Sequence, residues 1–250
     1  MKNNFSYFLE EKEKLSFFTF PKLRNIDSIV YGFTTKNWTK RTLIRSFNLS
    51  DFSIIYLNQI HSDKFHLLKE VTGKKLEGDA LITTIPNILL TVKTADCLPI
   101  LIFDKEEKVV SAIHVGWKGT IKKITQKVVQ VIVDSLGIKP FSLLALLGPC
   151  ICSRCYEVGE DVKEIWEKEW SSLNYVFKSL LVPSFKEGKY HLDLRKANTD
   201  QLEEMGLKQE NIFHVDLCTK CNTKLFYSNR QEPNSKGRMI SFIGLRNVGI

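Results

Sequence analysis

The sequence predicts an α+β fold built on mixed β-sheet, and two patterns carry this prediction. Short apolar runs typical of buried strands follow one another through hairpin-like turns between residues 79 and 115. Amphipathic segments typical of helices then alternate with further apolar runs over residues 119–245. Because hairpins and helical crossovers are mixed, we expect a mixed sheet rather than a doubly wound parallel one.

Length and composition are those of a globular protein. The 250 residues fit one large domain or two small ones, and 43% of them are hydrophobic while 26% are charged. The net charge is 36 − 28 = +8, with lysines spread along the chain rather than massed. A spread excess indicates solubility, with attraction of anionic ligands as the alternative. We expect no nucleic-acid partner, because no aromatic and basic stripe is present.

Two further patterns concern the cellular compartment. No window of about 18 uncharged apolar residues occurs, so we expect no membrane partner. A charged run at residues 10–14 interrupts what would have to be the apolar core of an export signal. We therefore expect a cytoplasmic protein whose six cysteines stay reduced and serve thiol chemistry or metal binding.

The predicted strands are short apolar runs bounded by turn residues. Residues 1–25 contain several aromatic side chains and are predicted to form an irregular N-terminal arm, which leaves residues 26–250 as a single domain. The segments between residues 87 and 115 are apolar on both faces, so they should lie in a sheet covered on both sides. Strands are expected at residues 28–35, 63–71, 79–84, 87–94, 98–104, 109–115, 141–149, 211–217 and 239–245.

Three segments with helical character connect these strands. Residues 119–137 form a strong amphipathic pattern, with Thr120 expected to cap the start and Gly137 the end. Residues 159–170, which are acidic and contain tryptophan, and residues 195–206 predict surface helices.

The hairpin around residues 105–108 makes a geometric prediction about Cys97 and His114. With these four residues as the turn, paired residues have numbers that sum to 213, so Pro99 faces His114. Cys97 lies two residues beyond Pro99, about 7 Å along a strand. Proline cannot donate to the strand ladder, so the chain can curl there. Cys97 and His114 are therefore expected to meet at one end of the sheet.

His61, in "NQIHS" just before a predicted strand, is the candidate third member of a metal site. Two imidazoles and one thiolate leave a fourth position open, which is the arrangement of a catalytic zinc. Asp96 or Gln59 is expected to orient a histidine through its second ring nitrogen. Other interpretations stay open: Cys97 as a small buried residue, His114 as a hydrogen-bonded core residue, or the two as nucleophile and base of a cysteine hydrolase. A copper electron-transfer site would also need an axial methionine near these ligands.

A phosphate site is predicted beside His114. The segment "GWKGT" leads from a strand directly into a helix, and backbone N–H groups at a helix start favour an anion, with Lys118 beside them. Glycines are also common at any strand–helix junction, so the phosphate site is one of two interpretations.

Two CxxC pairs have the spacing of a four-cysteine zinc knuckle. They are "CSRC" (Cys152, Cys155) and "CTKC" (Cys218, Cys221). The gap between them is long and a predicted strand precedes the first, so we expect one metal per chain. Two metals, one of which survives His61→Ala, would favour the knuckle and a zinc-stabilised interaction module.

Seven segments stand in this order along the chain: "NQIHS", "GDALITT", "VKTADCLPILIFD", "SAIHVGWKGT", "GPCICSRCYEVGEDV", "HLDLRKAN" and "DLCTKC…FYSNR…GR". Taken together they resemble one family, the laccase-domain, YfiH-like group, and the match runs from about residue 31 to residue 245. The family is also known as the multicopper polyphenol oxidoreductase or peptidoglycan editing factor family. The resemblance implies a single domain in which mixed sheets pack as a sandwich with helices outside, in α/β/β/α layers.

The resemblance also implies metal ligands and an activity. The family's ligands are the histidine of QxHS, the cysteine of ADC and the histidine of HxGW, which fall on His61, Cys97 and His114. Members are described as purine nucleoside phosphorylases acting on adenosine, inosine and methylthioadenosine, with adenosine deaminase and disputed polyphenol oxidase activities. Some are linked to correcting peptidoglycan precursors. We therefore expect a zinc enzyme, with copper as the alternative metal, that takes a purine nucleoside and phosphate and is a monomer or homodimer.

Three departures from the family pattern concern positive charge. Lys36 stands where an arginine is usual, and "NWTKRTLIRSFN" replaces a glycine-rich loop. Lys118 stands where an arginine usually follows HxGW, and Arg230 is single where two arginines often stand. Lysine keeps the charge but loses the fork that suits phosphate oxygens, so substrate affinity or preference should differ. These three residues, with Gln59, are the candidates for binding substrate and phosphate.

The catalytic roles of the carboxylates stay open at this point. Asp79, Asp96 and Glu157 are candidates for acid–base work or ribose binding, and Glu157 is equally a turn or cap residue. Deamination would use a zinc-activated water, but the H-x-E motif of zinc deaminases is absent after His61.

Overall fold

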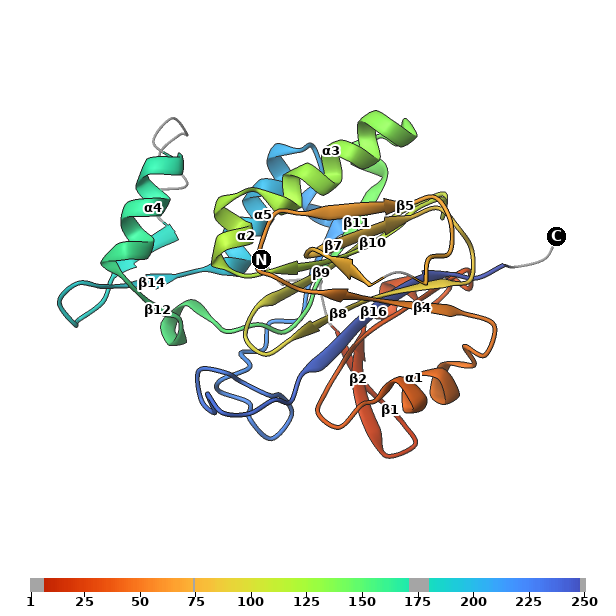
Figure 1. Ribbon diagram of the computed structural model, residues 1–250, viewed down its shortest axis with the longest axis horizontal. Coiled ribbons are helices and arrows are strands. Elements are labelled where there is room, and N and C mark those ends of the chain that lie inside the picture. The colour runs from red at the N-terminus through yellow and green to blue at the C-terminus, as the bar shows by residue number, and fades with distance from the viewer. Residues whose placement is uncertain (1–6, 74, 171–179, 248–250) are drawn as a thin grey trace.

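Two large mixed sheets lie face to face, with helices on both outer sides (Figure 1). The structure is a computed structural model, and it describes residues 7–73, 75–170 and 180–247. The α+β sandwich predicted for this chain is confirmed, including its order of layers from helix through two sheets to helix.

The central strand of the seven-stranded sheet comes from the C-terminal part of the chain. That strand, β16, pairs antiparallel with both β3 and β8, whereas β4 runs parallel to β8. The order across the sheet is β1 (Phe8–Lys12), β2 (Leu15–Thr19), β3 (Ile29–Thr34), β16 (Met239–Leu245), β8 (Ile88–Thr94), β4 (Ser53–Asn58) and β6 (Leu76–Glu77).

The six-stranded sheet contains the hairpin on which the site prediction rests. Strands β9 and β10 pair antiparallel with His114 opposite Pro99, so the predicted register is confirmed. The order across this sheet is β15 (Ile212–His214), β11 (Leu143–Leu147), β9 (Leu98–Asp104), β10 (Val110–Val115), β7 (Ala80–Thr83) and β5 (Phe65–Leu68).

The predicted irregular arm is wrong for the part of it that the structure describes. Strands β1 and β2 form a hairpin that extends the seven-stranded sheet through β3. Its turn, at Glu13 and Lys14, has positive φ at both residues, which matches the twist of a two-residue hairpin. Phe17 and Phe18 are adjacent but pack in different cores, because successive strand residues point to opposite faces. Residues 1–6 lie outside the described residues.

Three hydrophobic cores separate the layers, and strand periodicity divides the residues among them. Along β9, Ile100 and Ile102 face the outer helices, whereas Leu101 and Phe103 face the second sheet. The expectation that the central strands are covered on both faces is therefore confirmed. A third core packs the other face of the seven-stranded sheet against α1 (Lys40–Phe47).

The remaining helices cover the six-stranded sheet or stand beside it. Helices α2 (Trp117–Ile121), α3 (Ile124–Leu136) and α5 (Leu194–Glu204) lie on the sheet's outer face (Figure 1). Helix α4 (Glu160–Trp170) packs with a small sheet of β12 (Glu157–Gly159), β14 (Lys189–Leu192) and β13 (Leu181–Pro183) at one end. Short 3-10 helices occur at Pro21–Leu23, Pro140–Ser142, Ser153–Cys155 and Gln209–Asn211.

The helix predicted over residues 119–137 is two helices, and Thr120 is not its cap. Lys123 lies between α2 and α3 with a φ of 60°, and Gly137 ends α3 as predicted. Thr120 is buried inside α2, where its hydroxyl accepts a hydrogen bond from Asn198 and its carbonyl accepts one from Gln201. These contacts with α5 stabilise the break, which local sequence does not encode.

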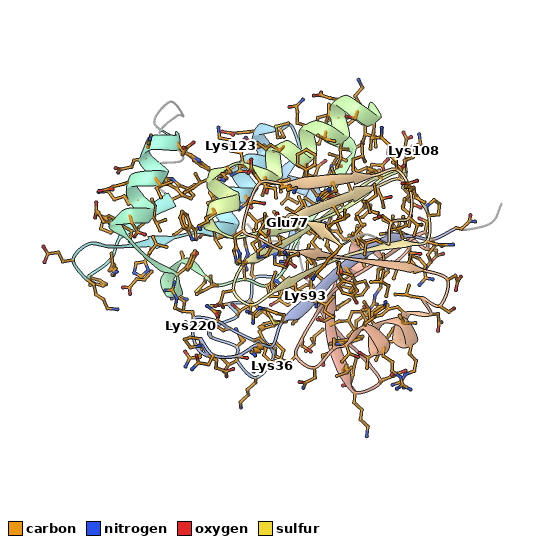
Figure 2. The ribbon with its side chains drawn as sticks, viewed as in Figure 1. Lys36, Glu77, Lys93, Lys108, Lys123 and Lys220 are labelled. Atoms are coloured by element: carbon orange, nitrogen blue, oxygen red, sulfur yellow. The ribbon has the colours of Figure 1, made fainter. Side chains whose placement is uncertain are left out.

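No helix in the described residues is long and apolar enough to cross a bilayer. The lysines labelled in Figure 2 come from distant parts of the chain and are spread over the molecule, as the sequence indicated.

Candidate metal centre and its pocket

His114 is fixed by the six-stranded sheet and by one buried carboxylate. It lies on β10 and is only 3% exposed. Its Nδ1 is 2.8 Å from Oδ1 of Asp79, which comes directly before the neighbouring strand β7. Because Asp79 engages Nδ1, Nε2 is the nitrogen that can bind a metal.

The same carboxylate holds the loop that carries His61. Oδ2 of Asp79 accepts hydrogen bonds from the Ser62 backbone N–H (2.6 Å) and hydroxyl (2.8 Å), and Oδ1 accepts one from the His61 N–H (3.1 Å). His61 has a φ of 55°, a conformation that few non-glycine residues adopt, and these bonds stabilise it. Burial raises the pKa of Asp79, but the hydrogen bonds from His114 and Ser62 outweigh it and lower that pKa to about 2. The carboxylate is therefore ionised at neutral pH.

Cys97 reaches the same place through a turn before β9. The predicted curl at Pro99 is wrong, because Pro99 stays in register in the strand. The chain turns instead at Asp96, whose φ is 92°. This turn directs Cys97 toward the two histidines.

The ligand atoms of His61, Cys97 and His114 all lie within 4.8 Å of one another. The Cys97 Sγ is 3.9 Å from His61 Nε2, and the two imidazole rings are nearly perpendicular, at 83°. Burial would raise the pKa of Cys97, but the charge of His114 and hydrogen bonds from both histidines lower it to about 6. Burial lowers the pKa of His114. The charge of the Cys97 thiolate and the hydrogen bond to Asp79 outweigh burial and raise that pKa to about 9.

This donor set fits a metal ion. Ligands in a tetrahedral zinc site lie about 3.3–3.6 Å apart when the bonds are about 2.0–2.3 Å. The 3.9 Å between Cys97 Sγ and His61 Nε2 is a few tenths of an ångström longer. Space at the site is kept by Gly116, where an added Cβ would lie 3.2 Å from Cys97 Sγ and 3.3 Å from a carbon of His61. Two imidazoles and a thiolate suit zinc or copper equally by ligand type.

A pocket of about 540 Å³ opens onto the three ligands, within the usual range of about 300–1,000 Å³ for small-molecule sites. Its lining combines the ligands with three cationic side chains, two large aromatic ones and an aspartate. The lining residues are Leu57, Gln59, His61, Lys93, Ala95, Asp96, Cys97, His114, Gly116, Trp117, Tyr156, Asn229, Arg230 and Arg238.

Asp96 and Gln59 line this pocket, but the prediction that one of them orients a histidine is wrong. Both oxygens of Asp96 are engaged, by the Thr219 hydroxyl (2.6 Å) and the Arg230 N–H (2.7 Å). Gln59 exchanges two hydrogen bonds of 2.8 Å with the Lys93 backbone. The orienting role belongs to Asp79, because β7 lies directly beside β10 in the sheet.

Four predicted site residues lie outside the set that lines the pocket, and one of them is the buried Asp79 described above. Lys118 lines a separate depression on α2, with its Nζ 5.5 Å from the ring of Trp117. Lys36 stands over the ring of Tyr227 at 5.0 Å. Glu157 accepts hydrogen bonds from Lys186 and Ser184, and these lower its pKa to about 2.

Residues 36–246 match the model of the multi-copper polyphenol oxidoreductase laccase family. This chain belongs to that family. It is 38% identical over 198 residues to a purine nucleoside phosphorylase of Deinococcus radiodurans. The aligned region covers 74% of this chain and 71% of the relative. It is 36% identical over 171 residues to adenosine deaminase RL5 of an unknown prokaryotic organism, with 68% of this chain and 63% of the relative covered.

Two solved structures share the fold of this chain. YlmD of Geobacillus stearothermophilus superposes with a TM-score of 0.85 at 23% identity, covering 97% of this chain and all of that one (100%). The YfiH protein of Bacillus licheniformis superposes with a TM-score of 0.78 at 26% identity, with 93% and 96% covered.

Several pocket residues of this laccase-family chain were not singled out from the sequence. Lys93, Trp117, Tyr156 and Arg238 all lie inside the quoted family segments, in "VKT", "HVGW", "CYEV" and "GR". The family segments therefore include these residues, but whether each side chain points into the pocket depends on how the segments pack. Met239, by contrast, packs in the core between the sheets and accepts a hydrogen bond from the Tyr227 N–H, so it is engaged elsewhere than at the metal centre.

Proposed function

We propose that this protein cleaves purine nucleosides by phosphorolysis in the pocket beside His61, Cys97 and His114, with zinc as its cofactor. The observation that carries the proposal is the meeting of a metal donor set, three cations and two aromatic rings in one pocket. The names of its relatives agree, since one is a purine nucleoside phosphorylase and another an adenosine deaminase.

The cations support phosphate as the second substrate. Lys93, Arg230 and Arg238 line the pocket, and guanidinium groups bind phosphate oxygens through paired hydrogen bonds. The carboxylate of Asp96 also lines the pocket. Its repulsion of an incoming anion is reduced because it already accepts hydrogen bonds from the Thr219 hydroxyl and the Arg230 backbone N–H. The guanidinium of Arg230 lies 5.3 Å from the ring of Tyr156, and its Nη1 donates a hydrogen bond of 2.9 Å to the backbone carbonyl of Glu157.

The aromatic residues support a purine base. Trp117 and Tyr156 line the same pocket and offer flat faces on which a purine can stack. Burial raises the pKa of Tyr156 well above its usual value, so its hydroxyl keeps its proton and serves as a hydrogen-bond donor.

In phosphorolysis a phosphate oxygen bonds to the anomeric carbon as the bond from that carbon to the purine breaks. The electron pair leaves on the purine, which takes up a proton. A zinc ion held by His61, Cys97 and His114 would supply Lewis-acid chemistry to this pocket. The protein's own part is to hold the phosphate with Arg230 and Arg238, to stack the base and to exclude water.

A cysteine hydrolase is the alternative that one observation favours. Cys97, His114 and Asp79 form a series of nucleophile, base and orienting carboxylate, and the pKa of Cys97 is lowered to about 6. Such an enzyme would act on amide or ester bonds, with peptidoglycan precursors as the candidate substrates. It would need no metal, and alkylation of the thiol would abolish its activity.

The test is to incubate the purified, zinc-loaded protein with adenosine and phosphate and to separate adenine from inosine by chromatography. We expect adenine and ribose 1-phosphate in equal amounts, only when phosphate is present, with loss of activity on chelation and recovery with zinc. Inosine alone would make the protein a deaminase. Neither product, together with thiol-dependent hydrolysis that survives chelation, would refute the proposal.

A further inference from the structure

Four cysteines from two distant parts of the chain meet at one edge of the six-stranded sheet. Cys152 and Cys155 lie in the connection after β11, at the start and the end of its short 3-10 helix, and Cys218 and Cys221 lie in the loop after β15. Strands β11 and β15 are parallel neighbours, so both loops leave the sheet at the same edge. Beyond the strands, an isolated parallel β-bridge between the backbones of Cys150 and Cys218 keeps the two loops together.

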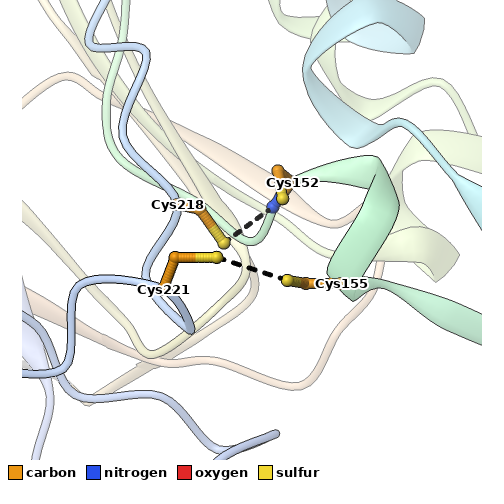
Figure 3. Close-up of side chains that lie close together, drawn as sticks. All are labelled: Cys152, Cys155, Cys218 and Cys221. Atoms are coloured by element: carbon orange, nitrogen blue, oxygen red, sulfur yellow. Dashed lines mark hydrogen bonds between the residues drawn. The ribbon is translucent and has the colours of Figure 1, made fainter.

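The four sulfur atoms all lie within 4.8 Å of one another. Figure 3 shows Cys155 and Cys221 pointing toward each other, with their sulfurs 3.4 Å apart. The backbone N–H of Cys152 donates a hydrogen bond of 3.3 Å to the sulfur of Cys218. Four sulfurs at about 2.3 Å from a zinc ion lie about 3.8 Å apart in a tetrahedron. That value falls between the 3.4 Å that separates the sulfurs of Cys155 and Cys221 and the 4.8 Å within which all four lie.

The chemistry of the cluster favours a metal over buried thiols or disulfides. Each loop supplies a CxxC pair, the spacing by which zinc knuckles place two sulfurs on one ion. A disulfide would join sulfurs only in pairs, whereas here all four converge. Cys150 provides the contrast, because it lies next to the cluster but is not one of the four converging cysteines, and its sulfur accepts a hydrogen bond of 3.6 Å from Arg195 instead.

We propose that Cys152, Cys155, Cys218 and Cys221 bind one zinc ion, separate from the metal centre of the pocket. Four protein ligands complete a tetrahedral site and leave no position for substrate, so this ion is structural. The sequence had favoured one metal per chain because of the long gap between the CxxC pairs. Adjacent parallel strands close that gap, and we now expect two.

The ion would fix one wall of the pocket. Tyr156, which lines the pocket, directly follows the ligand Cys155. Thr219 directly follows the ligand Cys218 and donates a hydrogen bond to Asp96, the residue before Cys97. The four cysteines are therefore positioning residues for the pocket and do not contact substrate.

Elemental analysis of four purified, zinc-loaded proteins tests the proposal. We expect about two zinc ions per chain in the wild type, one in Cys155→Ser/Cys221→Ser, one in His61→Ala and two in the matched control Cys150→Ala. One ion in the wild type that is lost in His61→Ala would overturn the proposal. So would two disulfide bonds found by thiol counting, or iron in place of zinc.

X-ray absorption at the zinc edge gives a second readout if the double variant does not fold. In His61→Ala the remaining zinc should show a shell of sulfur alone, at about 2.3 Å. Nitrogen ligands on that zinc would place it at the pocket and contradict a four-cysteine site. This measurement does not depend on the activity, so its failure and the failure of the phosphorylase proposal are distinguishable.

Discussion

Replacing Asp79 with asparagine removes the charge that fixes both histidines of the metal centre. Each carboxylate oxygen accepts at least two hydrogen bonds, Oδ1 from His61 and His114 and Oδ2 twice from Ser62. Asparagine keeps one oxygen and places an NH₂ group against the donors that faced the other. Two bonds to a charged acceptor are therefore lost or weakened, and at the lower value of about 1.5 kcal/mol each the variant loses about 3 kcal/mol of folding free energy.

Metal affinity should fall as well. Asp79 holds His114 in the tautomer that carries its proton on Nδ1, which leaves Nε2 free to bind a metal. Loss of such an orienting carboxylate typically costs about 10–100-fold in metal affinity. The assay is urea unfolding of the metal-free protein followed by tryptophan fluorescence, together with zinc titration against a competing chelator.

Asp104→Asn is the matched control for this experiment. Asp104 is also a buried carboxylate, and it accepts hydrogen bonds from the backbone N–H groups of Glu106, Lys108 and Val109 in the hairpin turn. We expect this control to lose stability while its zinc affinity stays unchanged. If Asp79→Asn binds zinc as tightly as the wild type, or if both variants lose zinc affinity equally, the orienting role of Asp79 is refuted.

The pH dependence of stability gives an independent check on Asp79. Its pKa in the folded protein is about 2, below the ordinary value of 3.8, so the ionised form stabilises the fold. This contribution is fully present above about pH 4 and is lost as the pH falls toward 2, and a shift of nearly two pH units corresponds to about 2 kcal/mol. Between pH 5 and 2 the metal-free wild type should therefore lose more stability than Asp79→Asn. Parallel curves for the two proteins would contradict the lowered pKa.

Further predictions concern the pocket. Gly116→Ala places a Cβ 3.2 Å from the sulfur of Cys97, and such crowding should cost about 1–3 kcal/mol in zinc binding or folding, measured by chelator competition and by urea unfolding. Arg230→Ala should raise the KM for phosphate at least about tenfold, since a charge-assisted hydrogen bond contributes about 1.5–3 kcal/mol. Lys118→Ala, outside the pocket, should leave that KM unchanged in the same initial-rate kinetics, and an equal effect of the two variants would count against our phosphate site. In the metal-free protein, alkylation of Cys97 by iodoacetamide should rise through a midpoint near pH 6, whereas Cys150, whose pKa burial raises to about 11, should stay unmodified in peptide mass spectra. A midpoint near 9 for Cys97 would contradict the effect of the histidines.

The central strands and their register were predictable because they are encoded locally. The apolar runs of β8, β9 and β10 and the polar turn at residues 105–108 fix the hairpin, and with it the pair Pro99 and His114. The three-stranded sheet, β4 and helix α1 were not predicted. Helix α1 begins at a capping box of Thr39 and Thr42, and it was missed because that signal is short and its residues are polar.

Features that depend on tertiary contacts were the ones missed. The break between α2 and α3 rests on hydrogen bonds from α5 to Thr120, which is 78 residues away from Asn198. The orienting carboxylate is Asp79 rather than Asp96 because β7, not the turn before β9, lies beside His114. The meeting of the four cysteines depends on β11 and β15 being neighbours, which sequence spacing alone does not indicate.

The most direct test of the central claim is an anomalous difference map at the zinc edge from crystals of the zinc-loaded protein. We predict a peak bonded to a ring nitrogen of His61, the sulfur of Cys97 and Nε2 of His114, at about 2.0–2.3 Å. Zinc-loaded crystals that show no peak among these three side chains would contradict the account.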